Sequence, residues 1–551
     1  MAFHSLVQRP SPRSKLVKLR MEQVQLVGSI QRNKSAMYNG GSHGAASYKT
    51  GPKMVWRWVL VCMALGSAAA VAICGLLAGY GDFVIRQQHP ALFQAAPFVV
   101  PDEQFVSSSS SIAQHRQQQH CQGKRLYIYN LPRLFNLDIL DRYCQNKTDY
   151  PEMCAKFVNS GMGFKLERVM EPLEAWYRTD QFSLDLLFHD RLKKYPCLTQ
   201  DPETADLFYA PYYAGLDVTE FLFATEIQLR DKLTQRFLGW MMAQPSFVRL
   251  QGHKHLLLLG RIVWDFHRTE VLSNWGNSLL KNGDVENMTA LILERDPEAS
   301  EAHQMAVPYP TSFHPKTDAE LKLWQEKVAS SNRDLSLVSF AGSPRRNKSK
   351  GHVMYAYLRD NLFEQCDKSN LCTPLLCDEI DCQANPHLVT NLLLRSTFCL
   401  QPPGDSPTRK GVFDCLVAGT IPVFFTVHSA YNQYLWHLPK DGDSYSVLYD
   451  EDEVRDKGFD VMAALQQIPA SKIKSMQETI LHKIIPVILY DHIDRDPNKK
   501  TKDAIDVILD HLLVEGFQTY PDEAKLSASL TMETAAYTRH LRTGRVAIFC
   551  D

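Results

Sequence analysis

Apolar runs with the length of buried strands alternate with amphipathic stretches from residue 121 onward. Runs that are apolar on both faces are typical of strands in a parallel sheet. The predicted strands are residues 124–129, 205–213, 255–259, 335–340, 398–400 and 421–425. The predicted helices are residues 170–177, 184–194, 352–365 and 388–395. This alternation predicts an α/β protein whose parallel sheets are covered by helices.

The alternation occurs twice, which predicts two consecutive α/β domains. We place an N-terminal domain at residues 121–334 and a C-terminal domain at 335–510, joined by the polar, helical segment 315–334 and followed by a tail at 511–551. Doubly wound domains bind ligands at the carboxyl ends of their strands, so we expect a ligand in a cleft between the two domains.

One uncharged apolar segment precedes these domains. Residues 58–80 carry no charge and are long enough to cross a bilayer, which predicts a transmembrane anchor. Residues 1–57 hold ten Lys and Arg against Glu22 alone, so this tail is expected in the cytosol and the domains across the membrane. Residues 81–120, rich in Gln, Ser and Pro, are expected to form a flexible stem.

The net charge of the chain is −1, and the basic tail contributes +9, so the remainder carries −10. An acidic remainder of this size argues against nucleic acid as a partner.

Eleven cysteines follow the predicted anchor, on the side of the membrane that is oxidising. Cys366, Cys372, Cys377 and Cys382 have no C-x-x-C spacing and no histidine at a ligand spacing, which favours disulfides over a metal site. The odd number leaves at least one thiol, and we expect it at Cys399 or Cys415, inside buried apolar runs. Asn146, Asn287 and Asn347 begin potential glycosylation sequons.

Residues 396–425 combine the features of a diphosphate site. A strand leads into the Pro/Gly/Asp loop 401–407, and a helix is expected at 408–418. Arg409 suits bidentate binding of phosphate oxygens, Lys410 supplies a point charge, and Asp414 lies one helical turn further on, where it can accept from ribose hydroxyls. The alternative is a βαβ crossover whose cations are only solvated surface charges.

The order of several motifs resembles the exostosin-type glycosyltransferases, family 47, in their plant branch, and within it the xyloglucan galactosyltransferases. The resemblance covers residues 125–510. The residues that carry it are 127–132, 211–217, 260–266, 308–315, 339–345, 398–406, 408–409 and 421–425. Two positions depart from the family pattern: Thr420 stands where members usually have cysteine, and Lys410-Gly411 where they have Arg-Ser.

The resemblance implies a GT-B fold, with two Rossmann-like domains, and an inverting transfer from a UDP-sugar to a polysaccharide acceptor. The implied product is galactosylated xyloglucan. Alternatives are another donor (UDP-galacturonic acid, UDP-arabinose or UDP-xylose) and a non-catalytic Golgi carbohydrate-binding protein. A Golgi membrane location through residues 58–80 and complexes with other Golgi transferases are also implied.

The resemblance also implies which residues bind the donor. They are Arg345, Gly404, Asp405, Ser406, Thr408, Arg409, Lys410 and Asp414. Cations of this set would neutralise the departing diphosphate. No Asp-x-Asp motif is expected to hold Mg²⁺ or Mn²⁺ for UDP, so no metal cofactor is expected.

Inversion requires a base on the acceptor side. Asp217, after a buried strand and a turn, is the first candidate, followed by Asp265 and His314. Each has a plainer interpretation: Asp217 as a helix cap, Asp265 as an ion-pair partner of Arg261 or Arg268, and His314 as a packed core histidine. Five aromatic residues are candidates for stacking on sugars, and we expect two of them to do so: Tyr212, Tyr213, Trp264, Tyr309 and Phe313.

Overall fold

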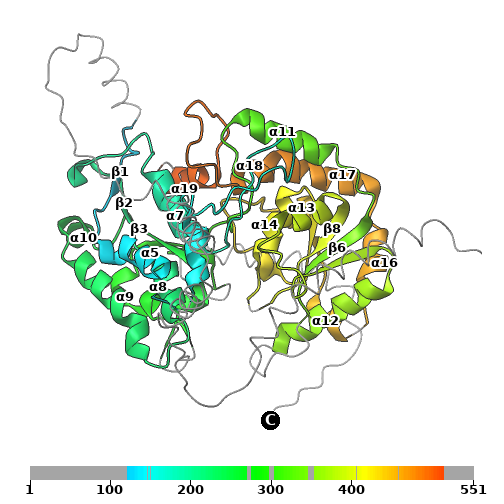
Figure 1. Cartoon of the computed structure of the whole chain (residues 1–551), viewed down its shortest axis with the longest axis horizontal. Helices are drawn as coiled ribbons and strands as arrows, with labels where there is room; N and C mark the ends of the chain where they lie inside the picture. Colours follow the sequence, from blue (N-terminus) through cyan, green and yellow to red (C-terminus); the bar gives the residue numbers. More distant parts are fainter. Residues whose placement is uncertain are drawn as a thin grey trace, which may run out of the picture. The chain divides into compact units, whose positions relative to one another are not determined.

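Two five-stranded parallel sheets form the framework of the part of the chain that the structure describes (Figure 1). The computed structural model describes residues 121–145, 147–148, 150–269, 275–296, 303–344, 353–404, 406–456 and 458–513. The strands are β1 (Leu126–Ile128), β2 (Leu207–Ala210), β3 (His255–Ile262), β4 (Thr289–Glu294), β5 (Gln304–Ala306), β6 (Ser336–Gly342), β7 (Cys372–Leu376), β8 (Ser396–Leu400), β9 (Ile421–Phe424) and β10 (Val447–Leu448). The predicted α/β architecture with parallel sheets is confirmed.

The first sheet runs in sequence order, β1-β2-β3-β4-β5. Every residue of β2 and β4 is buried, and so are all but the last of β3. Burial on both faces explains why these strands are apolar without alternation. Helices α7 (Leu184–Leu192) and α8 (Ala214–Phe221) pack against β3. We call this sheet with its helices the N-terminal half.

The second sheet has the order β10-β9-β8-β6-β7, with all neighbours parallel. Its first strand, β6, lies between β7 and β8, so the winding reverses direction between β6 and β8. Such a reversal opens a crevice at the carboxyl ends of the two strands, where open α/β sheets bind ligands. We call this sheet with its helices the C-terminal half.

The remaining helices have these bounds: α5 (Leu137–Cys144), α6 (Cys154–Phe157), α9 (Ile227–Met242), α10 (Pro245–Leu250), α11 (Asp318–Ala329), α12 (Val353–Lys368), α13 (Pro386–Leu394), α14 (Lys410–Val417), α15 (Glu451–Asp456), α16 (Val461–Gln466), α17 (Ala470–Thr479), α18 (Ile485–Ile488) and α19 (Ala504–Leu513). Helices α12, α13 and α14 pack against β7, β8 and β9.

The chain between the two sheets is fixed to the second one. Helix α11 is capped by Thr317, whose Oγ1 accepts from the Glu320 N–H, and its Trp324 Nε1 donates to the Val417 carbonyl over 2.9 Å. Beyond α11, the half-buried Arg333 guanidinium donates to five oxygens at the ends of α13 and α14. These are the carbonyls of Leu393, Ser396, Ala418 and Gly419 and the hydroxyl of Thr420. Burial lowers the pKa of Arg333 to about 10.

After the second sheet the chain returns to the N-terminal half. Arg191 on α7 pairs with Asp506 on α19 at 3.2 Å, and Lys194 pairs with Asp494. The α19 helix also contacts the C-terminal half, because the Ala504 carbonyl lies 3.2 Å from His437 Nε2. The last described helix therefore bridges both halves.

All six predicted strands lie where strands occur, but one predicted helix is wrong. Residues 170–177 are not helical; Trp176 bridges Phe313 and Tyr177 bridges Lys165 in antiparallel fashion. Pro172 lacks the N–H that a helix interior needs, and pairing with distant backbone satisfies this segment instead. The predicted helix at 408–418 begins two residues later, at Lys410.

The ten cysteines within the described residues form five disulfides: Cys121–Cys197, Cys144–Cys154, Cys366–Cys372, Cys377–Cys382 and Cys399–Cys415. The preference for disulfides in the cysteine cluster is confirmed. The expectation of a free thiol at Cys399 or Cys415 is wrong, because strand β8 and helix α14 bring the two α-carbons within 6.5 Å.

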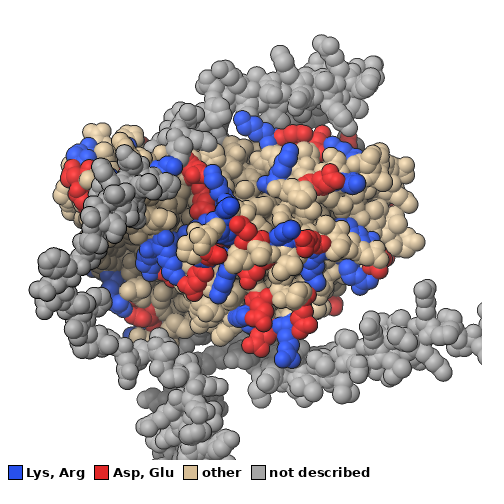
Figure 2. All heavy atoms as spheres, turned by 90° about the horizontal axis from the view of Figure 1, so that it is seen from above, with Lys and Arg blue, Asp and Glu red and all other residues tan. Residues whose placement is uncertain are grey.

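The predicted anchor at 58–80, the basic tail and the stem lie outside the described residues. Within the described part, no helix combines the length and apolar character needed to span a bilayer. On the face drawn in Figure 2, basic and acidic side chains are interspersed, without a broad patch of one sign.

Candidate functional site

A cavity of about 400 Å³ lies at the carboxyl ends of β6 and β8, where the second sheet changes direction. From the C-terminal half it is lined by Gly342 and Ser343 after β6, Gln401 and Pro402 after β8, Arg359 on α12, and Arg409, Lys410 and Asp414. From the N-terminal half it is lined by Thr179, Gln181 and Ser312. This volume suits a small organic ligand.

Arg409 immediately precedes α14, in extended conformation, and its guanidinium bends back over the loop. Nη1 donates to Ser406 Oγ over 3.0 Å. Nη2 is buried and has no hydrogen-bond partner among the described residues. A buried, unpaired donor on a cation is costly unless a ligand supplies an acceptor, so this atom indicates where an anion would bind.

Lys410 and Asp414, predicted to bind diphosphate and ribose, pair with each other across one turn of α14. The Lys410 ammonium lies 2.6 Å and 2.8 Å from the two carboxylate oxygens. Both residues line the cavity, so the pair is placed to contact a ligand. Their separate roles stay predictions.

Ser406 and Thr408 face away from the cavity, toward the N-terminal half. Ser406 Oγ donates to Glu294 Oε2 over 3.0 Å, and the Thr408 N–H donates to Oε1 over 3.2 Å. Glu294 ends strand β4 and is fully buried. Burial raises its pKa to about 7, against the opposing effect of the nearby Arg409 and the two donors.

Glu294 is absent from the sequence-based candidates. Its carboxylate directly follows the apolar run Ala290–Leu293, and a polar residue directly after a predicted strand is the pattern that indicated other candidates. Strand β4 itself was not predicted, so its last residue was not considered.

Arg359 is a second cavity residue that sequence reasoning missed. Its guanidinium donates to the carbonyls of Ser343 and Pro402, over 3.3 Å and 3.4 Å, and lies over the ring of Phe340. Gly342 makes this possible, since a Cβ there would be 2.6 Å from Nη2. Arg359 therefore joins the segment after β6 to the loop after β8.

Asp217, the first candidate for the base, is buried near the start of α8 and does not line the cavity. Tyr212 donates to its Oδ2 over 2.6 Å, and Arg142 lies 3.9 Å from Oδ1. Oδ1 has no hydrogen-bond partner among the described residues. Burial raises the pKa of Asp217 to about 7, with the Tyr212 hydrogen bond and Arg142 opposing.

The other two base candidates are engaged with protein groups. Asp265 forms an ion pair with Arg261 at 2.6 Å. His314 contacts the Tyr490 carbonyl through Nδ1 at 2.7 Å and the Thr179 hydroxyl through Nε2 at 2.8 Å. Burial lowers its pKa to about 4, so the ring is neutral. Thr179 Oγ1 also donates to the Met162 carbonyl over 2.9 Å, so His314 and Met162 together hold a residue that lines the cavity.

None of the five aromatic candidates lines the cavity. Four are buried in the core: Tyr212, Tyr213, Tyr309 and Phe313. Tyr212 stacks on Phe237, and Phe313 packs on Trp176 and Trp324. These four rings pack in the core, whereas Trp264 is half-buried, and the expectation that two of the five stack on sugars stays a prediction.

The cavity is closed on one side by a contact between the halves. Asp180, between the cavity residues Thr179 and Gln181, accepts from Gln383 Nε2 and pairs with Lys156 at 2.7 Å. Gln383 follows the Cys377–Cys382 disulfide and also lines the cavity. Lys156 neutralises Asp180, and the lining residues Thr179, Gln181 and Ser312 are uncharged. The wall that the N-terminal half presents to the cations of the C-terminal half is therefore neutral.

Two predicted donor ligands, Arg345 and Asp405, lie outside the described residues. Within the described residues no cluster of three or more His, Cys, Asp or Glu side chains is arranged to hold a metal ion. Asp-x-Asp sequences occur at 441–443, 450–452 and 494–496, and none of them lines the cavity.

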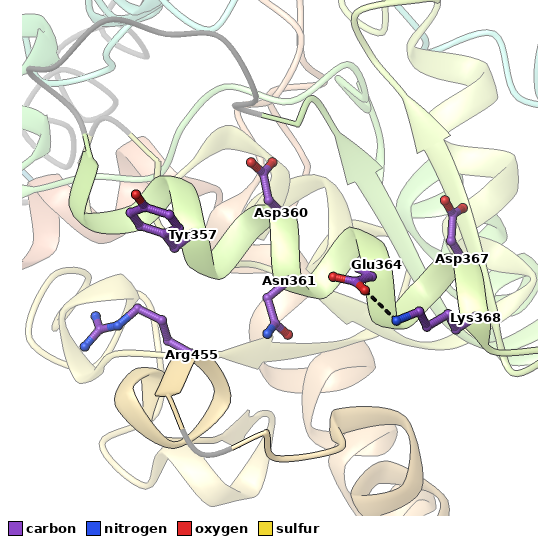
Figure 3. A pocket seen from close by; sticks show the side chains of 7 residues that line it. All are labelled: Tyr357, Asp360, Asn361, Glu364, Asp367, Lys368 and Arg455. Atoms are coloured by element: carbon purple, nitrogen blue, oxygen red, sulfur yellow. Dashed lines mark hydrogen bonds and ion pairs between the residues drawn. The ribbon is translucent and has the colours of Figure 1, made fainter.

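A larger hollow, of about 1000 Å³, lies along the opposite face of α12 (Figure 3). It is lined by Tyr357, Asp360, Asn361, Glu364, Asp367, Lys368 and Arg455. Its acidic side chains point into solvent from a single helix, and it contains none of the predicted donor or base residues. The cavity beside Arg409 is therefore the better candidate site.

Comparison with known proteins agrees with the resemblance seen in the motifs. The model of the exostosin GT47 domain matches residues 120–467. Xyloglucan galactosyltransferase MUR3 of Arabidopsis thaliana is 40% identical over 392 residues, covering 70% of this chain and 61% of the relative. Xyloglucan-specific galacturonosyltransferase 1 of the same plant is 38% identical over 397 residues, covering 71% and 57%.

A third relative from Arabidopsis thaliana, xyloglucan galactosyltransferase XLT2, is 35% identical over 401 residues, covering 71% of this chain and 75% of the relative. The chain thus spans less than two thirds of the length of the first two relatives and three quarters of the third.

Proposed function

Because the chain belongs to the exostosin GT47 family, we propose that it transfers galactose from UDP-galactose to a side chain of xyloglucan, with inversion at the anomeric carbon. Relatives of this chain are named xyloglucan galactosyltransferases, and we extend that activity to this chain.

The observation that carries the proposal is the buried Nη2 of Arg409 without a partner, beside a cavity of ligand size. A diphosphate leaving group develops negative charge as the bond to the sugar breaks, and cations stabilise that charge most where water is excluded. Arg409 stands at the cavity together with the Lys410–Asp414 pair. We assign the diphosphate to these cations, in place of a metal ion.

The acceptor hydroxyl must lose a proton as it attacks the sugar. Asp217 is the base we would test first, because its Oδ1 has no hydrogen-bond partner within the described residues, whereas Asp265 and His314 are engaged. A carboxylate with a pKa near 7 is suited to accept a proton at neutral pH. The neutral wall formed by Thr179, Gln181 and Ser312 would face the sugar and acceptor.

Arg359 favours a second donor, UDP-galacturonic acid. A uronic acid requires a cation for its carboxylate, and Arg359 is a cavity cation beyond those predicted for the diphosphate. One relative is named as a galacturonosyltransferase. The two donors differ at one sugar carbon, so the cavity accommodates either by size.

We further propose that residues 58–80 anchor the protein in the Golgi membrane, with residues 81–120 as the stem and the two halves in the lumen. The five disulfides support a location in an oxidising compartment.

The test is a donor screen with secreted residues 121–551, xyloglucan oligosaccharides as acceptors and EDTA in parallel samples. Turnover with UDP-galactose, retained in EDTA, is the expected result. Turnover with UDP-galacturonic acid alone would assign the second donor. Loss of turnover in EDTA, restored by Mg²⁺ or Mn²⁺, would overturn the metal-independent assignment. Binding of xyloglucan without turnover of any UDP-sugar would favour a non-catalytic carbohydrate-binding protein.

A further inference from the structure

Glu294 connects the first sheet to the donor loop (residues 401–409). It is the last residue of β4, and its side chain leaves the N-terminal half to reach Ser406 and Thr408. Each carboxylate oxygen accepts a hydrogen bond from the donor loop, at 3.0 Å and 3.2 Å, and the side chain is inaccessible to solvent. A buried carboxylate is stable only where donors satisfy it, and here two of them belong to the donor loop while the Tyr309 side chain of the N-terminal half is a third.

The backbone on either side of Glu294 is held from the C-terminal half as well. The Tyr434 hydroxyl donates to the Leu293 carbonyl over 3.0 Å. Gln433 accepts from the Arg295 N–H over 2.9 Å and donates to the Arg295 carbonyl over 3.0 Å. Three consecutive residues at the end of β4 therefore bond across the boundary between the halves, which fixes the direction in which the Glu294 side chain points.

The same carboxylate determines where Arg409 lies. Ser406 Oγ donates to Glu294 and accepts from Arg409 Nη1, so the three side chains form one chain of hydrogen bonds. A hydroxyl has a single proton, and Glu294 fixes its direction, leaving a lone pair of Ser406 for Arg409. With Nη1 so held, Nη2 lies buried against Gly404, and the arginine as a whole lines the cavity.

We infer that Glu294 is a positioning residue: through Ser406 and Thr408 it sets the donor loop so that Arg409 presents its guanidinium to the diphosphate of the nucleotide sugar. The inference rests on the proposed function, because it takes the cavity ligand to be a nucleoside diphosphate. It also changes the predicted roles of Ser406 and Thr408, whose donors serve the carboxylate and not the ligand.

A purely structural contact between the halves is the competing explanation. Loss of such a contact would lower the thermal stability without a specific change in nucleotide affinity. A positioning role predicts a change in affinity for UDP in a variant that is still folded, with the acceptor KM unaffected.

The experiment measures the Kd of UDP by calorimetry on residues 121–551 at pH 8, where both the nucleotide and Glu294 are ionised. Glu294→Gln keeps the shape but turns one acceptor into a donor that faces Ser406 or Thr408, and we expect it to weaken UDP binding about tenfold or more. Glu286→Gln, at an exposed glutamate of the same half, is the matched control and should bind UDP like the wild type.

A double-mutant cycle with Ser406→Ala separates the two explanations further. If Glu294 acts through Ser406, the losses of UDP affinity in the two single variants will not add in the double variant. Should Glu294→Gln fail to fold, Glu294→Asp, which keeps the charge but shortens the reach, is expected to weaken UDP binding with near-normal stability.

Folded Glu294 variants with wild-type affinity for UDP would overturn the inference and leave the proposed function intact. A wild-type protein that binds neither UDP nor any UDP-sugar would overturn both, since no diphosphate would then occupy the cavity.

Discussion

The guanidinium of Arg409 lies directly against the α-carbon of Gly404, so that a methyl group on Gly404 would be 1.7 Å from Arg409 Nη2. Only glycine leaves room for this approach. The position of the Arg409 guanidinium therefore depends on the absence of a side chain at residue 404. A substitution of Gly404 tests this dependence without removing any charge.

Gly404→Ala should displace Arg409 and raise the KM for the UDP-sugar about tenfold or more, because the guanidinium could no longer lie against residue 404 beside the cavity. Gly239→Ala is the control: Gly239 lies in helix α9 with no atom within 4 Å of a built Cβ, and alanine there should leave KM unchanged and stabilise the helix by up to about 1 kcal/mol. Steady-state kinetics on both variants decide; an unchanged donor KM in Gly404→Ala would contradict the assignment of Arg409.

Donor affinity should depend on pH through Glu294. Burial raises its pKa to about 7, and Arg409, Ser406, Thr408 and Tyr309 face it and oppose the shift. Above this pH the ionised carboxylate accepts both donor-loop hydrogen bonds; below it, the proton occupies one oxygen and affinity should fall. The measurement is the Kd of a UDP-sugar, whose diphosphate does not titrate near pH 7, in wild type and Glu294→Gln. A pH dependence that persists in the variant would assign it to another group.

The same shift has an opposite consequence for stability. The folded pKa of Glu294 lies above its ordinary value of 4.5, so folding favours the protonated form. Its contribution to the free energy of unfolding should decrease as pH rises from about 4.5 to about 7. Urea unfolding of wild type and Glu294→Gln across this range should show a smaller decrease in the variant.

Asp217→Asn should lower kcat by a factor of about 10² to 10⁴ and leave UDP affinity unchanged, as expected on removal of a general base. Because burial raises the pKa of Asp217 to about 7, kcat of the wild type should fall as pH decreases through that value. Asp284→Asn, at an exposed position, serves as the control. Transfer at the wild-type rate in Asp217→Asn would leave this carboxylate as a partner of Tyr212 and Arg142 only.

Arg333→Met should destabilise the protein by about 3 to 5 kcal/mol, because it removes the Arg333 donors from the Ser396, Ala418 and Gly419 carbonyls at the ends of α13 and α14. Arg395→Met removes an exposed ion pair with Asp334 and should cost less than about 1 kcal/mol. Chemical unfolding measures both. Equal effects would show that the Arg333 hydrogen bonds contribute little.

Residues 121–513 should contain no reactive thiol under denaturing, non-reducing conditions. Alkylation followed by mass spectrometry counts the thiols, with a reduced sample as the control that should show ten. Cys399→Ser combined with Cys415→Ser should cost about 2 to 4 kcal/mol of stability. Labelling of Cys399 or Cys415 in the native protein would restore the expectation of a free thiol.

The apolar pattern predicted most of the strands that are buried on both faces, but not β4, and it failed where long-range contacts decide. Strand β3 contains the apolar run Leu256–Leu259 and was predicted, whereas residues 170–177 have a helical pattern but pair with Phe313, far along the chain. The disulfide Cys399–Cys415 was missed for a related reason: burial alone does not show that two apolar runs lie side by side.

The residues of the candidate site that lie close together in the sequence could be predicted. Arg409, Lys410 and Asp414 do line one cavity, because a loop and one helical turn bring them together. Glu294 and Arg359 reach the same region from other elements, and only the packing of the two halves places them there. Their residue types were visible in the sequence, but their partners were not.

Thr420 stands where members of the family usually have cysteine, and its contacts explain the threonine in this chain. Its hydroxyl donates to the Leu393 carbonyl over 2.7 Å and accepts from Arg333 over 3.0 Å, so the position is a polar junction in this chain. Cys399, the cysteine of β8, forms its disulfide with Cys415, which lies five residues before Thr420.

Helix α19 returns the chain to the N-terminal half, where Asp506 meets Arg191, after the second sheet is complete. Neither half is therefore an uninterrupted stretch of sequence. A gene fragment that encodes residues 121–334 alone would lack the segment that neutralises Arg191, and a fragment that begins at 335 would carry that segment without its partner. Heterologous expression should keep both halves in one reading frame and extend through Leu513. If the two fragments are encoded as separate chains, we expect them to be soluble only when they are co-expressed.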